Sequence, residues 1–250
     1  MPTAKGGYKF ADGTKAPGVT TILESLGWGK EALMWWAWDL GRQGFDYKDL
    51  RKQAASIGTI AHERVEHHLL GIPWAAKEEY DPQDIVASDE PFEKYLEWRK
   101  GYDIEIVLAE KNLVSDELGY GGTPDFLAKM RKAGTDDPWR LVLIDLKTSK
   151  SIYPSHILQV AAYTDLIETV ESELVGANSA HWCIDDCLIL RVGKDDTEFE
   201  SRIIPQDDLT DGYGIFKALV LIHAQKAGFE KAYASKKKAK KATEPEETPE

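Results

Sequence analysis

The sequence predicts an α/β protein with a mixed central β-sheet flanked by helices and preceded by additional N-terminal helices. Between Leu50 and Leu70 apolar residues recur at the spacing of one helix face. From Ile104 to Ala109 apolar residues fall on alternate positions, which indicates a half-buried strand, and the apolar run Leu141 to Ile144 indicates a buried one. Helical and strand patterns that follow one another along the chain are typical of this class.

The length and composition favour one large domain with a substantial core. The chain has 250 residues, of which 42% are apolar, and it contains eight tryptophans. We expect a single domain over residues 1–234, made of a helical part at about 25–101, a core at about 102–205 and a final helix at about 206–234. Residues 235–250, a lysine run followed by glutamates and prolines, should form a disordered charged tail.

The charge and cysteine content restrict partners and compartment. A net charge of −12 ordinarily argues against nucleic acid, but a site that collects metal ions is itself acidic, and a basic groove can coexist with an acidic back. The only two cysteines, Cys183 and Cys187, are too few for a disulfide framework or a four-thiolate cluster. No apolar run approaches the roughly 20 residues that span a bilayer, and the N-terminus lacks a signal-peptide core, so we expect a cytoplasmic protein.

The N-terminal part of the chain contains a short pattern of a turn and β-branched residues, followed by an aromatic helix. A turn and a short β-branched run occupy Pro17 to Leu23. The next helix, over residues 30–40, is unusually aromatic, with Met34, Trp35, Trp36 and Trp38. We interpret this stripe as the contact of a helix packed on the core, with a base-stacking platform as the alternative.

A single histidine, His62, lies at the edge of the apolar stripe of the helix at Leu50 to Leu70. Glu63 follows it, but position 66 is glutamate, so the His-Glu-x-x-His spacing of zinc proteases is absent. By itself His62 is therefore better explained as a structural histidine.

Two acidic residues are predicted at the ends of the first two strands. Glu110 ends the strand of Ile104 to Ala109, on the face of its isoleucines. A glycine-rich turn then leads to a second strand at about Pro124 to Met130, paired with the first as a hairpin. Pro124 cannot donate to the ladder, so we expect the strand to be bent or unpaired there, which would aim Asp125.

The third strand ends in an acid and a base. Because side chains alternate along a strand, Asp145 and Lys147 point to the same side while Leu146 points to the other. A carboxylate and an ammonium at the end of a buried run are costly unless charged partners sit there too. A divalent metal ion and a phosphate would satisfy both.

The next predicted helix begins at Pro154 and runs to about residue 173, and it places His156, Gln159 and Tyr163 on one face. Taken alone, that face is explained equally well by solvent exposure and by function. Three further strand-like segments follow, namely Ala180 to Ile184, Leu188 to Val192 and Phe199 to Ile204.

Taken in order, four motifs on a helix, two strands and a helix resemble the PD-(D/E)XK nuclease superfamily. Within it they resemble the RecB-like exonuclease branch, which includes phage-type exonucleases and the mitochondrial genome maintenance exonuclease. The motifs are Gly58-Thr59-Ile60-Ala61-His62, Gly122-Thr123-Pro124-Asp125, Asp145-Leu146-Lys147 and Gln159-Val160-Ala161-Ala162-Tyr163.

The resemblance implies a restriction-endonuclease-like core and a site for one or two Mg²⁺ or Mn²⁺ ions. Some relatives carry a four-cysteine iron–sulfur cluster, and with two cysteines this chain is expected to lack it. It implies Lys147 beside the attacking water, with Asp125 and Asp145 as its catalytic companions. Gln159 and Tyr163 would steady the lysine or grip the DNA backbone, and Thr148 and Ser149 would also contact substrate. The implied metal ligands are His62, Glu110, Asp125, Asp145 and the Leu146 carbonyl.

The function expected from this resemblance is metal-dependent exonuclease cleavage of DNA, in recombination, repair or phage DNA processing. DNA is the expected partner, with a single-strand annealing or recombination protein as a candidate second one, and no membrane is involved. A structure-specific or flap endonuclease on the same fold is the first alternative. A non-catalytic nucleic-acid-binding protein is the alternative from another class.

Overall fold

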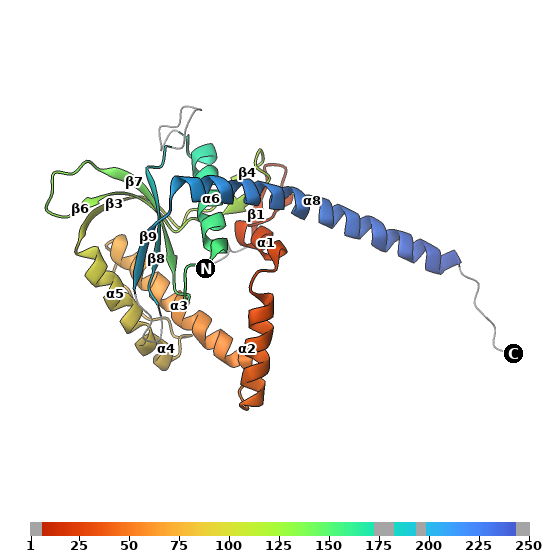
Figure 1. Ribbon diagram of the computed structural model, residues 1–250, viewed down its shortest axis with the longest axis horizontal. Helices are drawn as coiled ribbons and strands as arrows, with labels where there is room; N and C mark the ends of the chain where they lie inside the picture. The colour runs from red at the N-terminus through yellow and green to blue at the C-terminus, as the bar shows by residue number, and fades with distance from the viewer. Residues whose placement is uncertain (1–6, 173–182, 194–198, 244–250) are drawn as a thin grey trace.

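The computed structural model describes residues 7–172, 183–193 and 199–243, and its centre is a five-stranded sheet in the order β3-β6-β7-β8-β9. β3, β6 and β7 form an antiparallel meander, β7 and β8 are parallel, and β9 returns antiparallel to β8. The predicted α/β class with a mixed central sheet is confirmed (Figure 1). The strands are Tyr102–Ala109 (β3), Phe126–Lys132 (β6), Arg140–Lys147 (β7), Asp186–Arg191 (β8) and Glu200–Ile203 (β9).

One face of the sheet is covered by α6 (Pro154–Val170) and α8 (Gln206–Thr243). A parallel strand pair needs a crossover connection, and α6 lies in the one between β7 and β8. Pro154 occupies the first turn of α6, as predicted, where a missing backbone donor costs nothing. The buried side chains of this layer include Leu143 and Ile189 of the sheet, Leu166 of α6 and Phe216 of α8.

The opposite face packs against α3 (Tyr47–Leu69) and α5 (Asp89–Arg99), which the short α4 (Pro82–Ala87) connects. Their contacts in this layer include Val65 of α3 and Tyr95 of α5, against Ile144 and Leu146 of β7. Since side chains alternate along β7, Asp145 and Lys147 fall on the α6 side.

Between β3 and β6 the chain forms a small additional hairpin. The predicted pairing of the first two strands is confirmed by β3 and β6, but the glycine-rich segment is β4 (Leu113–Ser115) and β5 (Tyr120–Gly122) rather than a simple turn. β1 (Tyr8–Lys9), β2 (Lys15–Ala16) and α1 (Val19–Leu23) pack beside it.

Gly122 is the point of closest approach between this hairpin and α6. A Cβ atom there would lie 2.6 Å from Cε1 of Tyr163 and 3.2 Å from Cγ2 of Val19, both buried side chains. We therefore expect Gly122→Ala to destabilise the fold by about 1–3 kcal/mol through overpacking. Urea unfolding should show a lower midpoint at an unchanged m-value.

A glycine-to-alanine change at an exposed position should raise the stability of the fold instead of lowering it. Gly214 lies on the exposed side of α8, where an added Cβ atom would meet nothing within 4 Å, so Gly214→Ala should stabilise the helix slightly. Equal midpoints for Gly122→Ala and the unsubstituted protein would contradict the packing described for Tyr163.

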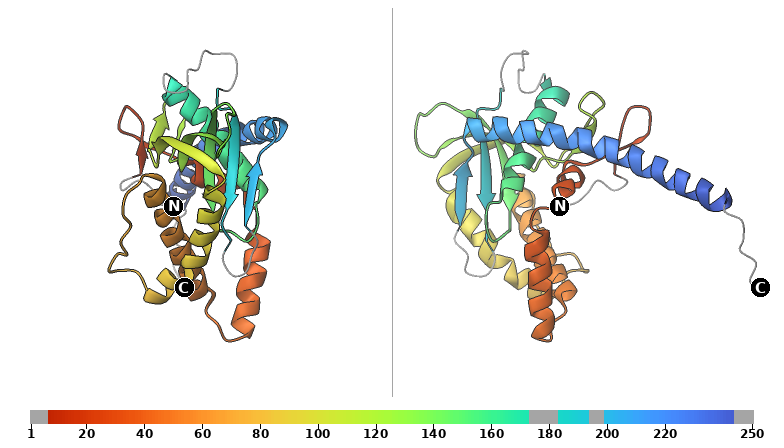
Figure 2. Two further views of the ribbon diagram at one scale, coloured as in Figure 1. Left: turned by 90° about the vertical axis from the view of Figure 1, so that its left-hand side faces the viewer. Right: turned by 45° about the vertical axis from the view of Figure 1, so that its right-hand side comes forward.

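The predicted burial of the aromatic helix is wrong. α2 (Lys30–Arg42) packs beside α3, with Leu40 buried, and it leaves Met34, Trp35 and Trp38 exposed. Figure 2 shows this helix extending away from the sheet. Helical spacing correctly predicted the helix, but no layer of the described chain lies opposite its aromatic stripe.

Two C-terminal predictions also need correction. The final helix does not stop near residue 234 but continues as α8 to Thr243, because the alanines and lysines of the expected tail are good helix formers. Residues 244–250 lie outside the described part. Of the strand expected over residues 180–184, only Cys183 and Ile184 are described, and they precede β8 without belonging to a strand. No helix in the described ranges is both long and apolar enough to cross a membrane.

Candidate metal centre

Three strand ends meet at one edge of the central sheet. Glu110 directly follows β3 and Asp125 directly precedes β6, and because these strands are antiparallel the backbone N–H of Glu110 donates to the Asp125 carbonyl at 2.9 Å. β7 is antiparallel to β6, so its C-terminal end lies beside Asp125 as well. The backbone N–H of Leu146 donates to Oδ2 of Asp125 at 2.8 Å. Asp125 thus links the ends of its two neighbouring strands.

Glu110 has a strained backbone. Its φ is 46°, and among the described residues it is the single non-glycine residue with positive φ. Such a conformation costs of order 1–3 kcal/mol and tends to persist where the surroundings require it. Here it turns the chain out of β3 directly beside Asp125.

His62 reaches this edge from α3. Its Nδ1 lies 3.4 Å from Oε1 of Glu110, its Nε2 lies 3.2 Å from Oδ2 of Asp125, and its ring stacks on Phe126 at 6.5 Å between centroids. One potential ligand atom from each of His62, Glu110 and Asp125 lies within 4.8 Å of the others. The structure therefore brings together three of the five predicted metal ligands.

Asp145 and Lys147 form a buried ion pair on the α6 side of β7. Nζ of Lys147 lies 2.5 Å from Oδ2 of Asp145, and both side chains are buried. Oδ1 of Asp145 has no hydrogen-bond partner in the described chain. The predicted common orientation of the two residues is confirmed, and Asp145 retains an oxygen without a partner.

Burial and mutual repulsion perturb the acids of this edge. Burial, reinforced by the charge of Asp125, raises the pKa of Glu110 to about 7. Burial also raises the pKa of Asp145 to about 6, although Lys147 opposes the shift. For Asp125, burial is outweighed by His62, Lys147 and the Leu146 N–H, so its pKa is lowered. For His62, burial is outweighed by the charges of Asp125 and Glu110, so its pKa is raised. The positive charges of His62 and Lys147 therefore do not fully offset the three carboxylates of the cluster.

The residues present fit a divalent cation. Oε1 of Glu110 and Nε2 of His62 are buried and, like Oδ1 of Asp145, have no aligned hydrogen-bond partner among the described residues. Carboxylate oxygens are the preferred ligands of Mg²⁺ and Mn²⁺, and an imidazole is accepted by Mn²⁺. A cation would satisfy these atoms and relieve the repulsion between the carboxylates.

We expect Mn²⁺ or Mg²⁺ to stabilise the folded protein. A ligand at a hundred times its dissociation constant adds about 2.7 kcal/mol, which for a chain of this size corresponds to a rise in Tm of about 5–10 °C. Differential scanning calorimetry in EDTA and in MnCl₂ measures the difference, with NaCl at equal ionic strength as the control. An unchanged Tm at millimolar Mn²⁺ would argue against a metal site.

The remaining predicted residues divide into two groups. Thr148 and Ser149 line a hollow of about 390 Å³ together with His62 and Lys147, so their side chains share a space with the cluster. Gln159 and Tyr163 are buried in α6, where Nε2 of Gln159 donates to the Tyr163 hydroxyl at 3.0 Å. A buried Tyr163 is suited to positioning its neighbours rather than to gripping DNA. Leu146 donates its backbone N–H to the carboxylate of Asp125.

The structure adds two supporting residues, Tyr8 and Asn112, that the sequence patterns did not single out. The Tyr8 hydroxyl lies 2.8 Å from Oγ1 of Thr123, which donates to Oδ1 of Asn112 at 2.7 Å. These bonds hold the segment just before Asp125. His156 shares a helix face with Gln159, as predicted, and burial together with the charge of Lys147 lowers its pKa to about 4, so it is neutral near pH 7.

No known protein-family model and no curated protein matches the sequence. Among solved structures, the chain is similar to the crystal structure of a "putative exonuclease" from Eubacterium rectale, with a TM-score of 0.38 and 9% sequence identity. The similarity covers 65% of this chain and 64% of that one, so the chain spans less than two thirds of that protein's length.

Proposed function

We propose that this protein is a metal-dependent deoxyribonuclease, and specifically an exonuclease that hydrolyses the phosphodiester bonds of linear DNA. The observation that carries the proposal is the meeting of His62, Glu110 and Asp125 with the ion pair of Asp145 and Lys147 at one sheet edge. The order of these residues along the chain is also the order in the PD-(D/E)XK motifs that the sequence resembles.

The proposed roles follow from the donor types. His62, Glu110, Asp125 and Asp145 would hold Mg²⁺ or Mn²⁺. When bound, the ion supplies Lewis-acid polarisation of the phosphate and a lowered pKa of bound water. Phosphodiester hydrolysis forms a bond from water oxygen to phosphorus and breaks the bond from phosphorus to a sugar oxygen.

Lys147 is the residue proposed to act on the reacting atoms. Its ammonium group, held by Asp145, can orient the attacking water and offset negative charge that develops on the phosphate oxygens. The hydroxyls of Thr148 and Ser149 line the same hollow and can donate to phosphate oxygens. Gln159 and Tyr163 are proposed as positioning residues, because their buried hydrogen bond fixes their side chains on α6, the helix on the side of the sheet where Asp145 and Lys147 lie.

Purified protein should degrade linear DNA in Mg²⁺ or Mn²⁺ and lose this activity in EDTA. Covalently closed circular DNA of the same sequence distinguishes the two nuclease types, because an exonuclease leaves it intact and an endonuclease nicks it. Degradation of linear DNA at the same rate in EDTA would exclude the metal-dependent mechanism. Absence of hydrolysis under all metal conditions would favour a non-catalytic binding protein.

A further inference from the structure

An unusually aromatic surface lies on α2, the helix that packs beside α3, and α3 carries His62. We call the exposed side chains of Met34, Trp35 and Trp38 on α2, with Trp28 just before it, the aromatic face. Trp35 is 64% exposed and Trp38 57% exposed, although tryptophan is among the most buried residues on average. Contiguous apolar surface of this kind marks an interaction site in soluble proteins.

Cations accompany these rings. The guanidinium of Arg42 lies 4.9 Å from the ring centroid of Trp38. Lys30 begins α2, and Arg51 lies at the N-terminal end of α3. Neither Lys30 nor Arg51 forms an ion pair with any residue of the described ranges. Aromatic rings interleaved with unpaired cations suit a ligand that offers both flat rings and negative charge.

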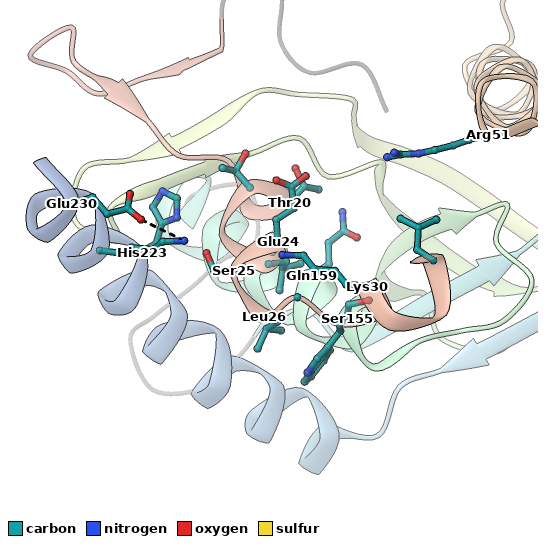
Figure 3. Close-up of a pocket in the computed structure, with 16 residues that line it drawn as sticks. Thr20, Glu24, Ser25, Leu26, Lys30, Arg51, Ser155, Gln159, His223 and Glu230 are labelled. Atoms are coloured by element: carbon teal, nitrogen blue, oxygen red, sulfur yellow. Dashed lines mark ion pairs between the residues drawn. The ribbon is translucent and has the colours of Figure 1, made fainter. Parts of the chain in front are cut away.

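A hollow of about 800 Å³ is lined by Trp28 of the aromatic face together with Lys30 and Leu33 of α2. Ser155 and Gln159 of α6 form part of its wall (Figure 3). Two acids, Glu24 and Glu230, also line it, and Glu230 is paired with Lys226 at 4.0 Å. A space of this volume takes a few nucleotides rather than a duplex.

This hollow and the one at the metal centre are lined by neighbouring parts of the same two segments. On α3, Arg51 lines the larger hollow, and Ala54, Ala55, Gly58 and His62 line the smaller one. On the other side, Thr148 and Ser149 line the smaller hollow, and Ser155 and Gln159 line the larger one. A nucleic-acid strand that follows α3 therefore passes from the larger hollow, which Trp28 of the aromatic face lines, to the smaller one, which Lys147 lines.

We propose that the aromatic face and the larger hollow bind a single-stranded segment of DNA that leads to the candidate metal centre. This inference rests on the proposed nuclease function. Unpaired bases stack on Trp35 and Trp38, and phosphates contact Lys30 and Arg51. Single-stranded DNA is favoured over duplex, because the bases of a duplex are stacked on one another and offer no free faces to side chains.

The test measures binding without cleavage. A fluorescein-labelled 20-nucleotide oligo-dT is titrated in EDTA, with anisotropy as the readout, against the unsubstituted protein and the Trp35→Ala/Trp38→Ala variant. Loss of base stacking should weaken binding about tenfold or more for each tryptophan. A blunt duplex of equal length should bind both proteins equally. Far-UV circular dichroism and Tm should be unchanged, since both side chains are exposed.

Two further variants make the result specific. Trp139→Ala removes another partly exposed tryptophan, which lies just before β7 at the end of the strand opposite Lys147, and it should leave oligo-dT binding unchanged. Trp35→Phe/Trp38→Phe keeps aromatic rings and should retain more affinity than Trp35→Leu/Trp38→Leu, which keeps only the apolar surface.

The outcomes separate this inference from the nuclease proposal. Equal oligo-dT affinity of the alanine variant and the unsubstituted protein would overturn the single-strand path, whether or not the protein cleaves DNA. A change from dimer to monomer in the alanine variant, seen by analytical ultracentrifugation with unchanged oligo-dT binding, would assign the aromatic face to a second copy of the chain and also overturn it. Normal oligo-dT binding by a protein without metal-dependent cleavage would refute the nuclease proposal alone.

Discussion

Replacing Lys147 with alanine is expected to lower the rate of DNA hydrolysis by about a hundred- to a thousandfold, the cost of removing one preorganised donor from a transition state. Lys147 is buried beside Asp145, with their charged atoms 2.5 Å apart, and it lines the hollow that His62 also lines. No other lysine or arginine among the described residues lines that hollow. The rate is measured under single-turnover conditions on end-labelled linear DNA in Mn²⁺, so that product release does not mask the chemical step.

A second lysine variant distinguishes the specific position of Lys147 from the general loss of one positive charge. Lys150 lies three residues further along, is exposed, and lines neither hollow, so Lys150→Ala removes the same charge and should retain the activity. Mn²⁺ binding by Lys147→Ala should persist, because its ammonium group is not a metal ligand. Activity of Lys147→Ala within about threefold of the unsubstituted protein would contradict the assigned role.

Replacing Asp125 with asparagine is expected to weaken Mn²⁺ binding by more than about a hundredfold and to abolish hydrolysis. Changes to residues that merely support a ligand already cost about 10- to 100-fold in metal affinity, and Asp125 is proposed as a ligand itself. Its Oδ2 lies 3.2 Å from Nε2 of His62 and accepts the Leu146 N–H. Asparagine keeps the shape and one acceptor oxygen, so the strand ends stay joined while the negative charge is lost.

Isothermal titration calorimetry with MnCl₂ measures this change. Asp136→Asn is the control, since Asp136 is exposed in the loop between β6 and β7 and should bind Mn²⁺ as the unsubstituted protein does. If Asp125→Asn bound Mn²⁺ with unchanged affinity, the metal ligands would have to lie elsewhere in the chain.

The two acids of the cluster whose pKa is raised, Glu110 and Asp145, help to explain why a cation is expected there. The pKa of Glu110 is raised to about 7 and that of Asp145 to about 6, so both carboxylates are less favourably ionised in the folded protein than in the unfolded chain. A raised carboxyl pKa means that the metal-free fold loses stability as the pH rises through the interval between the unfolded and folded values. A bound divalent cation would reverse this trend, because it favours the ionised form.

Local sequence patterns predicted the elements that carry the candidate site. Alternation along β7 was enough to place Asp145 and Lys147 on one side, since a strand has a fixed period of two. The apolar stripe of α3 predicted the helix that carries His62, and Pro154 predicted the start of α6. These features depend on backbone geometry and nearest neighbours, so they can be read from short segments.

Local patterns did not predict burial correctly where burial depends on which other element packs against a helix. Aromatic spacing in α2 predicted burial, yet the described chain offers no facing layer to Trp35 and Trp38. Periodicity reports that a helix has an apolar side, but it does not report whether another element covers that side. The charged segment after residue 234 likewise continued as helix, because its residues favour that conformation even without a core to join.

The sequence by itself determined the mixed α/β class, the order of the motif residues and the common orientation of Asp145 and Lys147. Only the tertiary structure decided that His62 lies between Glu110 and Asp125, that Tyr8 supports the segment before Asp125 through Thr123, and that neighbouring parts of α3 line the hollow at Trp28 and the hollow at Lys147. The physical reason is that these contacts join residues as far as 115 positions apart in the chain, and their distances follow from how strands pair and helices pack rather than from any local period.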